Sequence, residues 1–337
     1  MPRLSPARVL QFAALAVWAV VCLFPLYWLA ITSIKSLPDI DRAPHYVPFL
    51  DFTPTLDSWR FIFSDPHESL VPRFLNSLLI GTSATAVTVI TAAMALYGLT
   101  RSQPSVRWPS LVTAMLAVSL LSIAPVADTL LSRIGLLLSV GLLLTIAVGL
   151  WRRGPSVNLF GAISVMLATR LLPPIVILVP LYIMAAGAKL LDTQLVLIVA
   201  YTAVNLPVAL WLLQPVLGTR ATEPEEAAQL DGASHLAILF EIVLPMIGGG
   251  LMAAGVVVFL LCWNEYLFAV SLTSDHALTL PPWMVGQLSM KEAQVGGEAE
   301  EIGRLSAAAV LMIVPPLCIA AFARELLARS FASKSRP

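Results

Sequence analysis

The chain has 337 residues, of which 58% are hydrophobic and only 12% are charged, and its mean hydropathy is +0.86. A soluble protein has about 45–50% apolar and about 25% charged residues, so this composition excludes an ordinary soluble domain. Twenty basic and twenty acidic residues give zero net charge, which argues against a nucleic-acid-binding protein because that class needs a basic excess. The high hydrophobicity also excludes a disordered chain. The remaining class is a polytopic protein of the lipid bilayer.

A membrane helix needs about 20 mainly apolar residues to cross a hydrocarbon core roughly 30 Å thick. The sequence therefore predicts an all-α bundle with about eight transmembrane helices. They are expected at residues 10–32, 75–99, 109–130, 132–151, 158–187, 192–214, 247–270 and 303–327. The first stretch is too long for a signal peptide, and Pro25–Trp28 stands where a small-residue cleavage site would be, so we interpret it as a retained span.

The distribution of Lys and Arg predicts the orientation, because these residues favour cytoplasmic loops. The short loops Arg101–Arg107 and Trp151–Arg153 carry the clearest basic excess. Placing them inside makes both termini cytoplasmic, in a multi-pass protein of the cell inner (plasma) membrane. The outer segments 35–74 and 271–302 are too long for simple turns, and the aromatics of the first favour a folded, partner-facing cap.

Residues that could support metal or thiol chemistry are scattered. Cys22, Cys262 and Cys318 each lie in a separate apolar stretch, which is typical of small buried hydrophobes and not of a metal site or a disulfide. The four histidines show no HExxH spacing, and no GxxxxGK[ST] phosphate loop occurs. We therefore expect no catalytic residue, metal or cofactor in this chain.

The long inner loop 215–246 has the most specific sequence pattern outside the apolar spans. Pro224 suits a first helical turn and the neighbouring acids suit the positive end of a helix dipole, while Gly232 suits a C-terminal turn. A helix resting on the bilayer prefers Lys and Arg on its polar face, whereas this one is acidic. Its small apolar face flanked by acids favours insertion into a groove on a partner protein.

The same loop carries a motif. Glu226-Ala227-Ala228, Gly232, Ile242 and Leu244-Pro245 match the pattern EAA-x3-G-x9-I-x-LP at every fixed position. The loop resembles the EAA loop of ATP-binding-cassette importer permeases, and the surrounding chain is similar to the carbohydrate-uptake, maltose-type branch. Further matches are Asn76–Leu78, Ala95–Arg101, Pro180–Tyr182, Leu191–Thr193, Trp263–Tyr266 and Thr279–Pro281.

This resemblance implies a six-span core into which residues 105–155 insert a helical hairpin. Because the insertion adds two spans, the EAA loop stays cytoplasmic. The expected organisation is 1–104 with spans 1 and 2 and the outer loop 35–74, 105–155 as the inserted hairpin, 156–330 as the permease core with the EAA loop at 220–245, and 331–337 as a cytoplasmic tail.

The resemblance also implies partners and a coupling site. The loop would be a coupling helix seated in a separate ATPase subunit that binds ATP and Mg²⁺. The expected assembly is a heterodimer with a second permease, two ATP-binding subunits and an extracytoplasmic solute-binding protein, with a sugar as substrate and no nucleic acid. The implied coupling residues are Glu226, Ala227, Ala228, Leu230, Asp231, Gly232, Ile242, Leu244 and Pro245.

Several polar residues inside the spans are candidates for lining the translocation pathway: Asn76, Thr85, Thr88, Tyr201, Asn205, Asn264 and Glu265. For the threonines of the second span, close helix packing is the alternative. Glu265 suits either a gate or a solvated place near the outer interface. Arg170, just before the helix-interrupting Pro173-Pro174, either lines the pathway or reaches the cytoplasmic headgroups.

The importer hypothesis has two competitors. One is a permease of the same kind for a non-sugar solute. The other, from a different class, is an intramembrane enzyme, which needs paired acids, a Ser/His arrangement or a metal cluster at the active depth. The spans offer only an isolated Glu265 and an isolated Arg170, which favours the transport subunit.

Overall fold

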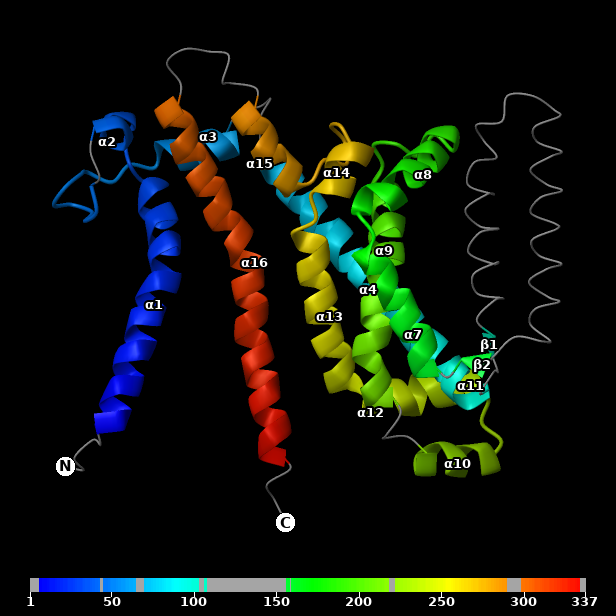
Figure 1. The fold of residues 1–337 in the computed structure, drawn as a ribbon. Coiled ribbons are helices and arrows are strands. Elements are labelled where there is room, and N and C mark those ends of the chain that lie inside the picture. Colours follow the sequence, from blue (N-terminus) through cyan, green and yellow to red (C-terminus); the bar gives the residue numbers. More distant parts are fainter. Residues whose placement is uncertain are drawn as a thin grey trace. The chain divides into compact units, whose positions relative to one another are not determined.

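The computed structural model describes residues 6–42, 45–64, 70–102, 106–107, 156–157, 159–217, 222–289 and 298–333. These residues are almost entirely helical, as predicted (Figure 1). Apart from connecting loops, they include a pair of two-residue strands, β1 (Val106–Arg107) and β2 (Ser156–Val157), which pair antiparallel with Val106 opposite Val157. The inserted spans expected at 109–130 and 132–151 lie outside the described residues.

The chain divides into two compact units. The first unit comprises residues 1–75 and 280–321, and the second comprises residues 76–279 and 322–337. The first contains the helices α1 (Pro6–Thr32), α2 (Leu37–Arg42), α3 (Asp57–Ser64), α15 (Leu280–Ser289) and most of α16 (Glu298–Ser333). The second contains most of α4 (Leu70–Ser102) and all helices from α7 to α14.

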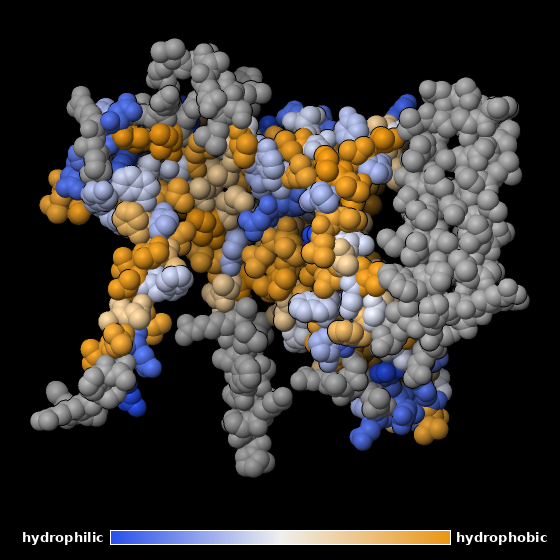
Figure 2. Space-filling view, in the orientation of Figure 1, coloured by the Kyte–Doolittle hydropathy of each residue, from blue (hydrophilic) through white to orange (hydrophobic). Residues whose placement is uncertain are grey.

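In the first unit, α1 presents an apolar surface along its length (Figure 2). Its most apolar 18-residue stretch contains no buried residue, and burial begins only at Ile31 near its end; this is the pattern of a helix that faces lipid. Beyond its end, Lys35 is buried with its ammonium 4.4 Å from the ring centroid of Trp28 and 5.4 Å from that of Phe52. The segment after α1 is thus folded by aromatic packing.

The helix α3 continues this packing. The indole of Trp59 donates a hydrogen bond to Ser33 Oγ at 3.2 Å. Gly303 of α16 lies so close to α3 that an added Cβ would stand 2.6 Å from Ser58 Oγ. Arg304 of α16 lies over the ring of Phe61. The described residues between α1 and α4 therefore have a defined fold within this unit.

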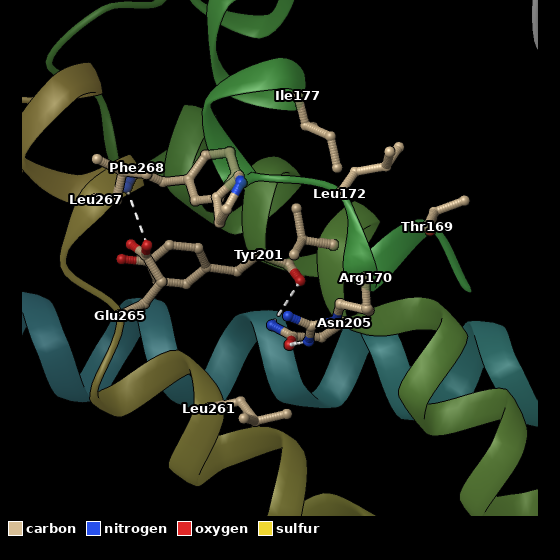
Figure 3. Close-up of a pocket in the computed structure, with 12 residues that line it drawn as sticks. Thr169, Arg170, Leu172, Ile177, Tyr201, Asn205, Leu261, Glu265, Leu267 and Phe268 are labelled. Carbon is tan, nitrogen blue, oxygen red and sulfur yellow. Dashed lines mark hydrogen bonds between the residues drawn. The ribbon is translucent and has the colours of Figure 1, made fainter. Parts of the chain in front are cut away.

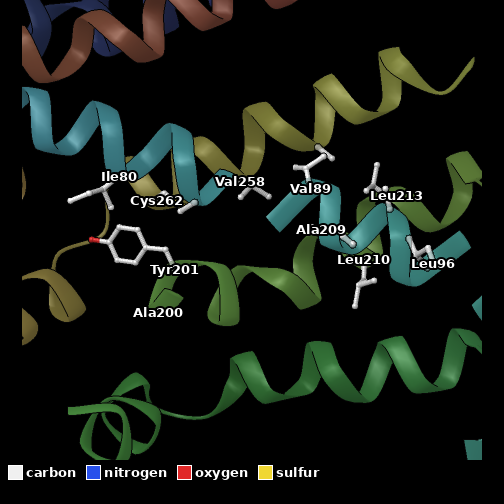
Figure 4. Close-up of a cluster of buried hydrophobic side chains, with 14 of the residues drawn as sticks. Ile80, Val89, Leu96, Ala200, Tyr201, Ala209, Leu210, Leu213, Val258 and Cys262 are labelled. Carbon is white, nitrogen blue, oxygen red and sulfur yellow. The ribbon is translucent and has the colours of Figure 1, made fainter. Parts of the chain in front are cut away.

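The second unit has one hydrophobic core, shared mainly by α4, α9 (Gln194–Leu217) and α13 (Gly248–Trp263) (Figure 4). Large side chains such as Leu96, Leu213 and Val258 alternate there with alanines. The buried alanines are Ala84, Ala92, Ala93, Ala200, Ala209 and Ala254. Small residues let helices approach closely where lipid gives no hydrophobic drive for association.

Two spans of this unit are bent. The pair α7 (Leu159–Ala168) and α8 (Pro174–Gly187) turns by 88° after a 3₁₀ turn at Thr169–Leu171, where Pro173-Pro174 interrupt the helix as predicted. The segment from α11 (His235–Ala237) through a π-helical stretch (Ile238–Val243) and α12 (Leu244–Met246) meets α13 at 79°. Counting each bent pair as one span gives six candidate spans among the described residues, and four without them.

One predicted span is wrong at its end. Residues 247–270 do not form a single helix, because α13 ends at Trp263 and α14 begins at Leu267 and ends at Leu272. The carboxylate of Glu265 accepts hydrogen bonds from the backbone N–H groups of Phe268 and Ala269. Such a side chain satisfies the free amides of a new helix and so competes with continuation of the old one.

Candidate functional site

The predicted coupling motif lies on α10 (Thr222–Leu230) and on the turn that follows it. Glu223 and Glu225 occupy the first turn, where the positive end of the helix dipole stabilises their negative charges. The helix ends in a turn at Gly232, whose φ of 83° belongs to the left-handed region that glycine adopts without strain. The N–H of Ala233 then bonds to the carbonyl of Ala228 at 3.0 Å, which closes the helix end.

The members of the motif divide into an exposed group and a packed group. Glu226, Ala227, Asp231 and Gly232 are exposed, and Leu230 is 90% exposed. Ala228 packs against the hydrophobic core. Figure 2 shows hydrophilic residues gathered over α10. The helix thus turns an acidic face with one large apolar side chain away from this chain.

The segment after Gly232 leads back into the core. Ser234 caps α11 by accepting the N–H of Ala237 at 3.3 Å. In the π-helical stretch Ile242 is half-buried beside the buried Val243; Leu244 packs on the core, and Pro245 is exposed. These motif residues therefore attach the loop to α13.

An ion pair that the motif did not predict holds α10 in place. Arg101, in the last turn of α4, donates from Nε to Glu225 Oε2 at 2.6 Å and from Nη2 to Oε1 at 2.5 Å. The side chain of Glu225 is 3% exposed and that of Arg101 is 25% exposed. The sequence offered two adjacent acids, and only the packing of α10 decides that Glu225 faces inward while Glu226 faces outward.

At the opposite end of the unit, Asp192 clamps the loop between α14 and α15. Its carboxylate accepts backbone N–H groups of four consecutive residues, Ser274 to Ala277. Partial burial opposes ionisation, but the hydrogen bonds dominate and lower the pKa of Asp192 to about 2. The left-handed φ of Asp192, 57°, lets its own N–H reach the carbonyl of Leu272.

Asn76, a candidate pathway residue, belongs to the same clamp. Its Nδ2 donates to the carbonyls of His276 and Leu278, and its Oδ1 accepts from Gln194. Thr85 and Thr88 donate to the helix carbonyls four residues earlier, and Asn264 donates to Leu260. None of these four candidates lines the cavity that the remaining three share.

The other three candidates, Tyr201, Asn205 and Glu265, come together around a cavity of about 150 Å³ (Figure 3). Arg170 joins them from the 3₁₀ turn at the break between α7 and α8. Asn205 Oδ1 accepts a hydrogen bond from Arg170 Nη2, and its Nδ2 donates to the carbonyl of Tyr201. Figure 3 shows the hydroxyl end of Tyr201 beside the carboxylate of Glu265.

This cavity combines features of a solute site. Its wall contains apolar side chains from α8, α13 and α14, and its polar groups converge from separate elements. Such pockets, mostly apolar with few placed polar groups, are the usual form of small-molecule sites. The 88° break supplies one side, as non-helical backbone at membrane depth is tolerated where it lines a cavity.

Comparison with known proteins places these features in context. A family model described as "binding-protein-dependent transport system inner membrane component" matches residues 141–333, more than half of the chain. The sulfoquinovosyl glycerol transport system permease protein of Agrobacterium fabrum is 26% identical over 273 residues, which cover 81% of this chain and 76% of that protein. The trehalose/maltose transport system permease protein of Thermococcus litoralis is 25% identical, over 81% and 79%.

A longer match is the trehalose transport system permease protein of Mycobacterium tuberculosis, 23% identical over 92% of this chain and 94% of that protein. A chain from a crystal structure described as a bacterial ABC transporter involved in the import of the acidic polysaccharide alginate shares the fold, with a TM-score of 0.63 and 15% identity over 96% of this chain and 99% of that chain. The chain belongs to the family of binding-protein-dependent transport system inner membrane components, as a multi-pass translocation subunit and not an enzyme.

Proposed function

We propose that this chain is one permease of an ATP-driven sugar importer. The full-length relatives named above are permeases for sulfoquinovosyl glycerol, trehalose/maltose and trehalose. The cavity beside Tyr201 and Asn205 supports this proposal, because it offers hydroxyl, amide and carboxylate groups to a polyhydroxylated solute.

The observation that carries the coupling step is the exposure of Leu230. This leucine is 90% exposed at the end of a helix whose inner face is packed and ion-paired. A large apolar side chain on a rigid helix suits a hydrophobic groove in a partner. In our proposal α10 docks into a separate ATPase that binds ATP and Mg²⁺, with Glu226, Ala227, Asp231 and Gly232 around the anchor, while this chain itself holds no cofactor.

The complete assembly in this proposal has four kinds of subunit: this chain, a second permease, two copies of the ATPase and an extracytoplasmic solute-binding protein. The α10 end of the second unit faces the cytoplasm together with both termini, and the loop held by Asp192 faces outward. In support, Figure 1 shows α10 at one end of this unit and α8 and α14 at the other.

Co-purification tests the proposal. The tagged chain, expressed with its candidate partners, should recover an ATPase and a second permease, and proteoliposomes of this complex should take up a sugar only with ATP and the binding protein. Leu230→Asp should lower the recovered ATPase about tenfold, as loss of a central apolar anchor does. Leu56→Asp changes an exposed leucine of the outer segment and serves as the matched control. Full ATPase recovery with Leu230→Asp, or a stable single chain that transports alone, would contradict the proposal.

A further inference from the structure

The cavity at the broken span contains two ionisable side chains with different surroundings. Glu265 is occupied, since its two carboxylate oxygens accept the N–H groups of Phe268 and Ala269 at 3.0 and 3.2 Å. It therefore serves as the cap of α14, and the positive end of that helix balances its negative charge.

The positive charge of Arg170, in contrast, has no group of opposite charge bonded to it among the described residues. A guanidinium carries five N–H donors and a permanent positive charge, and among the described residues its hydrogen-bond acceptor is the neutral amide of Asn205. No carboxylate in that part of the chain lies within ion-pair distance of it, Glu265 included. Most of its donors therefore remain available to something that enters the cavity.

The backbone near Arg170 contributes further positive charge to the cavity. The helix α8 begins at Pro174, which lines the cavity, and the N-terminal end of a helix carries a partial positive charge. Asn205 is 3% exposed, so the acceptor that orients the guanidinium is fixed inside the core. The cavity thus presents an oriented, uncompensated positive group opposite a carboxylate already bound to its own helix.

Taking this chain as the sugar permease proposed above, we infer that the cavity is a subsite for an acidic sugar unit, with the anionic group of the sugar on Arg170. Arginine binds a carboxylate or sulfonate through two parallel hydrogen bonds. Each carboxylate oxygen of Glu265 accepts one backbone N–H and keeps a second lone pair, which can accept a hydrogen bond from a sugar hydroxyl. The cavity volume of about 150 Å³ is below the roughly 300–1,000 Å³ of sites that enclose a drug-sized ligand, so it suits one sugar unit and not a longer chain.

A matched pair of probes tests this inference on the assembled complex of both permeases and the ATPases, without binding protein. Titration calorimetry with D-glucuronate and D-glucose compares the same ring with and without a carboxylate. We expect glucuronate to bind at least about tenfold more tightly, the size of a charge-assisted hydrogen-bond contribution. Arg170→Gln should remove this preference, and Arg170→Lys, which keeps the charge but loses the fork, should retain part of it. Arg60→Gln, at an exposed arginine of α3, is the control and should leave the preference unchanged.

Other results overturn the inference. Equal affinity for the two probes, or a preference that survives Arg170→Gln, shows that Arg170 does not select an anion. A lipid headgroup offers the same anionic oxygens, so mass spectrometry of the complex measures bound anionic lipid: if lipid is lost with Arg170→Gln and glucuronate fails to displace it, the site belongs to lipid. If the complex assembles and imports a neutral sugar but shows no preference, this inference fails while the proposed function stands; if no ATPase co-purifies, the proposed function fails.

Discussion

The guanidinium of Arg101 and the carboxylate of Glu225 form a two-point hydrogen-bonded ion pair that fastens α10 to the end of α4. The two residues are 124 positions apart in the chain. The side chain of Glu225 is almost fully buried, so the Arg101 guanidinium takes the place of the water that would otherwise hydrogen-bond to this carboxylate. In the proposed assembly, a force that the ATPase applies to α10 would reach α4 through this ion pair as well as α13 through the loop.

Removing the arginine tests this connection. Arg101→Gln should lower the free energy of unfolding by about 1–3 kcal/mol, because it leaves a buried carboxylate without its charged partner. Thermal unfolding of the purified chain in detergent and ATP-dependent uptake measure the effect. The double variant Arg101→Gln/Glu225→Gln should recover part of the stability.

The control for this pair is Glu223→Gln, which changes an exposed acid in the same helix. It should cost no more than the roughly 0.3–1 kcal/mol of an exposed carboxylate at a helix N-terminus, and it should leave uptake unchanged. If Arg101→Gln behaves like this control, the ion pair contributes nothing to holding α10.

Substitutions at Gly232 can distinguish the effect of backbone strain on stability from the effect of an added side chain on ATPase binding. A Cβ at this position would meet nothing within 4 Å, but its φ of 83° is unfavourable for most side chains. Gly232→Ala should therefore cost about 1 kcal/mol of stability from strain alone. Asn adopts the left-handed region more readily, so Gly232→Asn should unfold near the wild-type temperature and still lose ATPase in a pull-down. Normal ATPase recovery with Gly232→Asn would show that no partner approaches this turn.

Much of this architecture was predictable because apolar runs of about 20 residues have one stable solution in lipid, a membrane helix. The C-terminal turn at Gly232 was predictable for a similar local reason, since its left-handed φ is one that glycine adopts without strain. The break at Pro173-Pro174 also followed from local chemistry. These features depend on residues close to one another in sequence.

The site itself depended on contacts that sequence does not encode locally. The convergence of Arg170, Asn205 and Glu265 requires the 88° bend of one span and the early end of another. Asn76 and Thr88 are equally polar in sequence, yet Asn76 bonds to the loop held by Asp192 and Thr88 bonds to the backbone of its own helix. Polarity in a span therefore indicated candidate residues, and only tertiary packing decided which of them line the cavity and which bond to the protein's own backbone.

The low pKa of Asp192 predicts a pH dependence of stability. Its pKa in the folded chain is about 2, below the value of about 3.9 for an unperturbed aspartate. A carboxyl group with a lowered folded pKa stabilises the fold above its unfolded pKa, and this contribution is lost as the pH falls from about 4 towards 2. Between pH 5 and pH 2.5, the wild-type unfolding temperature should fall more steeply than that of Asp192→Asn.

At pH 7, Asp192→Asn should itself be less stable than the wild type, because an amide accepts the N–H groups of Ser274 to Ala277 less strongly than a carboxylate. Asp41→Asn, at an exposed aspartate of α2, is the matched control and should follow the wild-type pH curve. Parallel curves for the wild type and Asp192→Asn would contradict the clamp.

Gly250 predicts a steric effect between α9 and α13. A Cβ at this glycine would stand 2.4 Å from Cγ1 and 2.9 Å from Cγ2 of Val216, whereas a Cβ at Gly249 would meet nothing within 4 Å. Gly250→Ala should therefore destabilise the chain by about 1–3 kcal/mol through overpacking, and Gly249→Ala should not. Val216→Ala, which removes the opposing methyl groups, should restore the stability of Gly250→Ala. If the double variant remains as unstable as the single one, the close approach of these helices is not the cause.

The pairing of β1 with β2 predicts that the segment between them is removable. Arg107 lies opposite Ser156 in an antiparallel register, so the two ends of residues 108–155 are adjacent. A two-residue Asn-Gly turn closes such a pair with the twist that antiparallel strands prefer. Replacing 108–155 by Asn-Gly should preserve assembly with the ATPase and sugar uptake, because α4 and α7 keep their connection. The control joins Ser102 to Leu159 directly, which deletes the strand pair, and it should assemble less well. Complete loss of uptake with the Asn-Gly variant in a correctly assembled complex would show that the replaced segment takes part in transport.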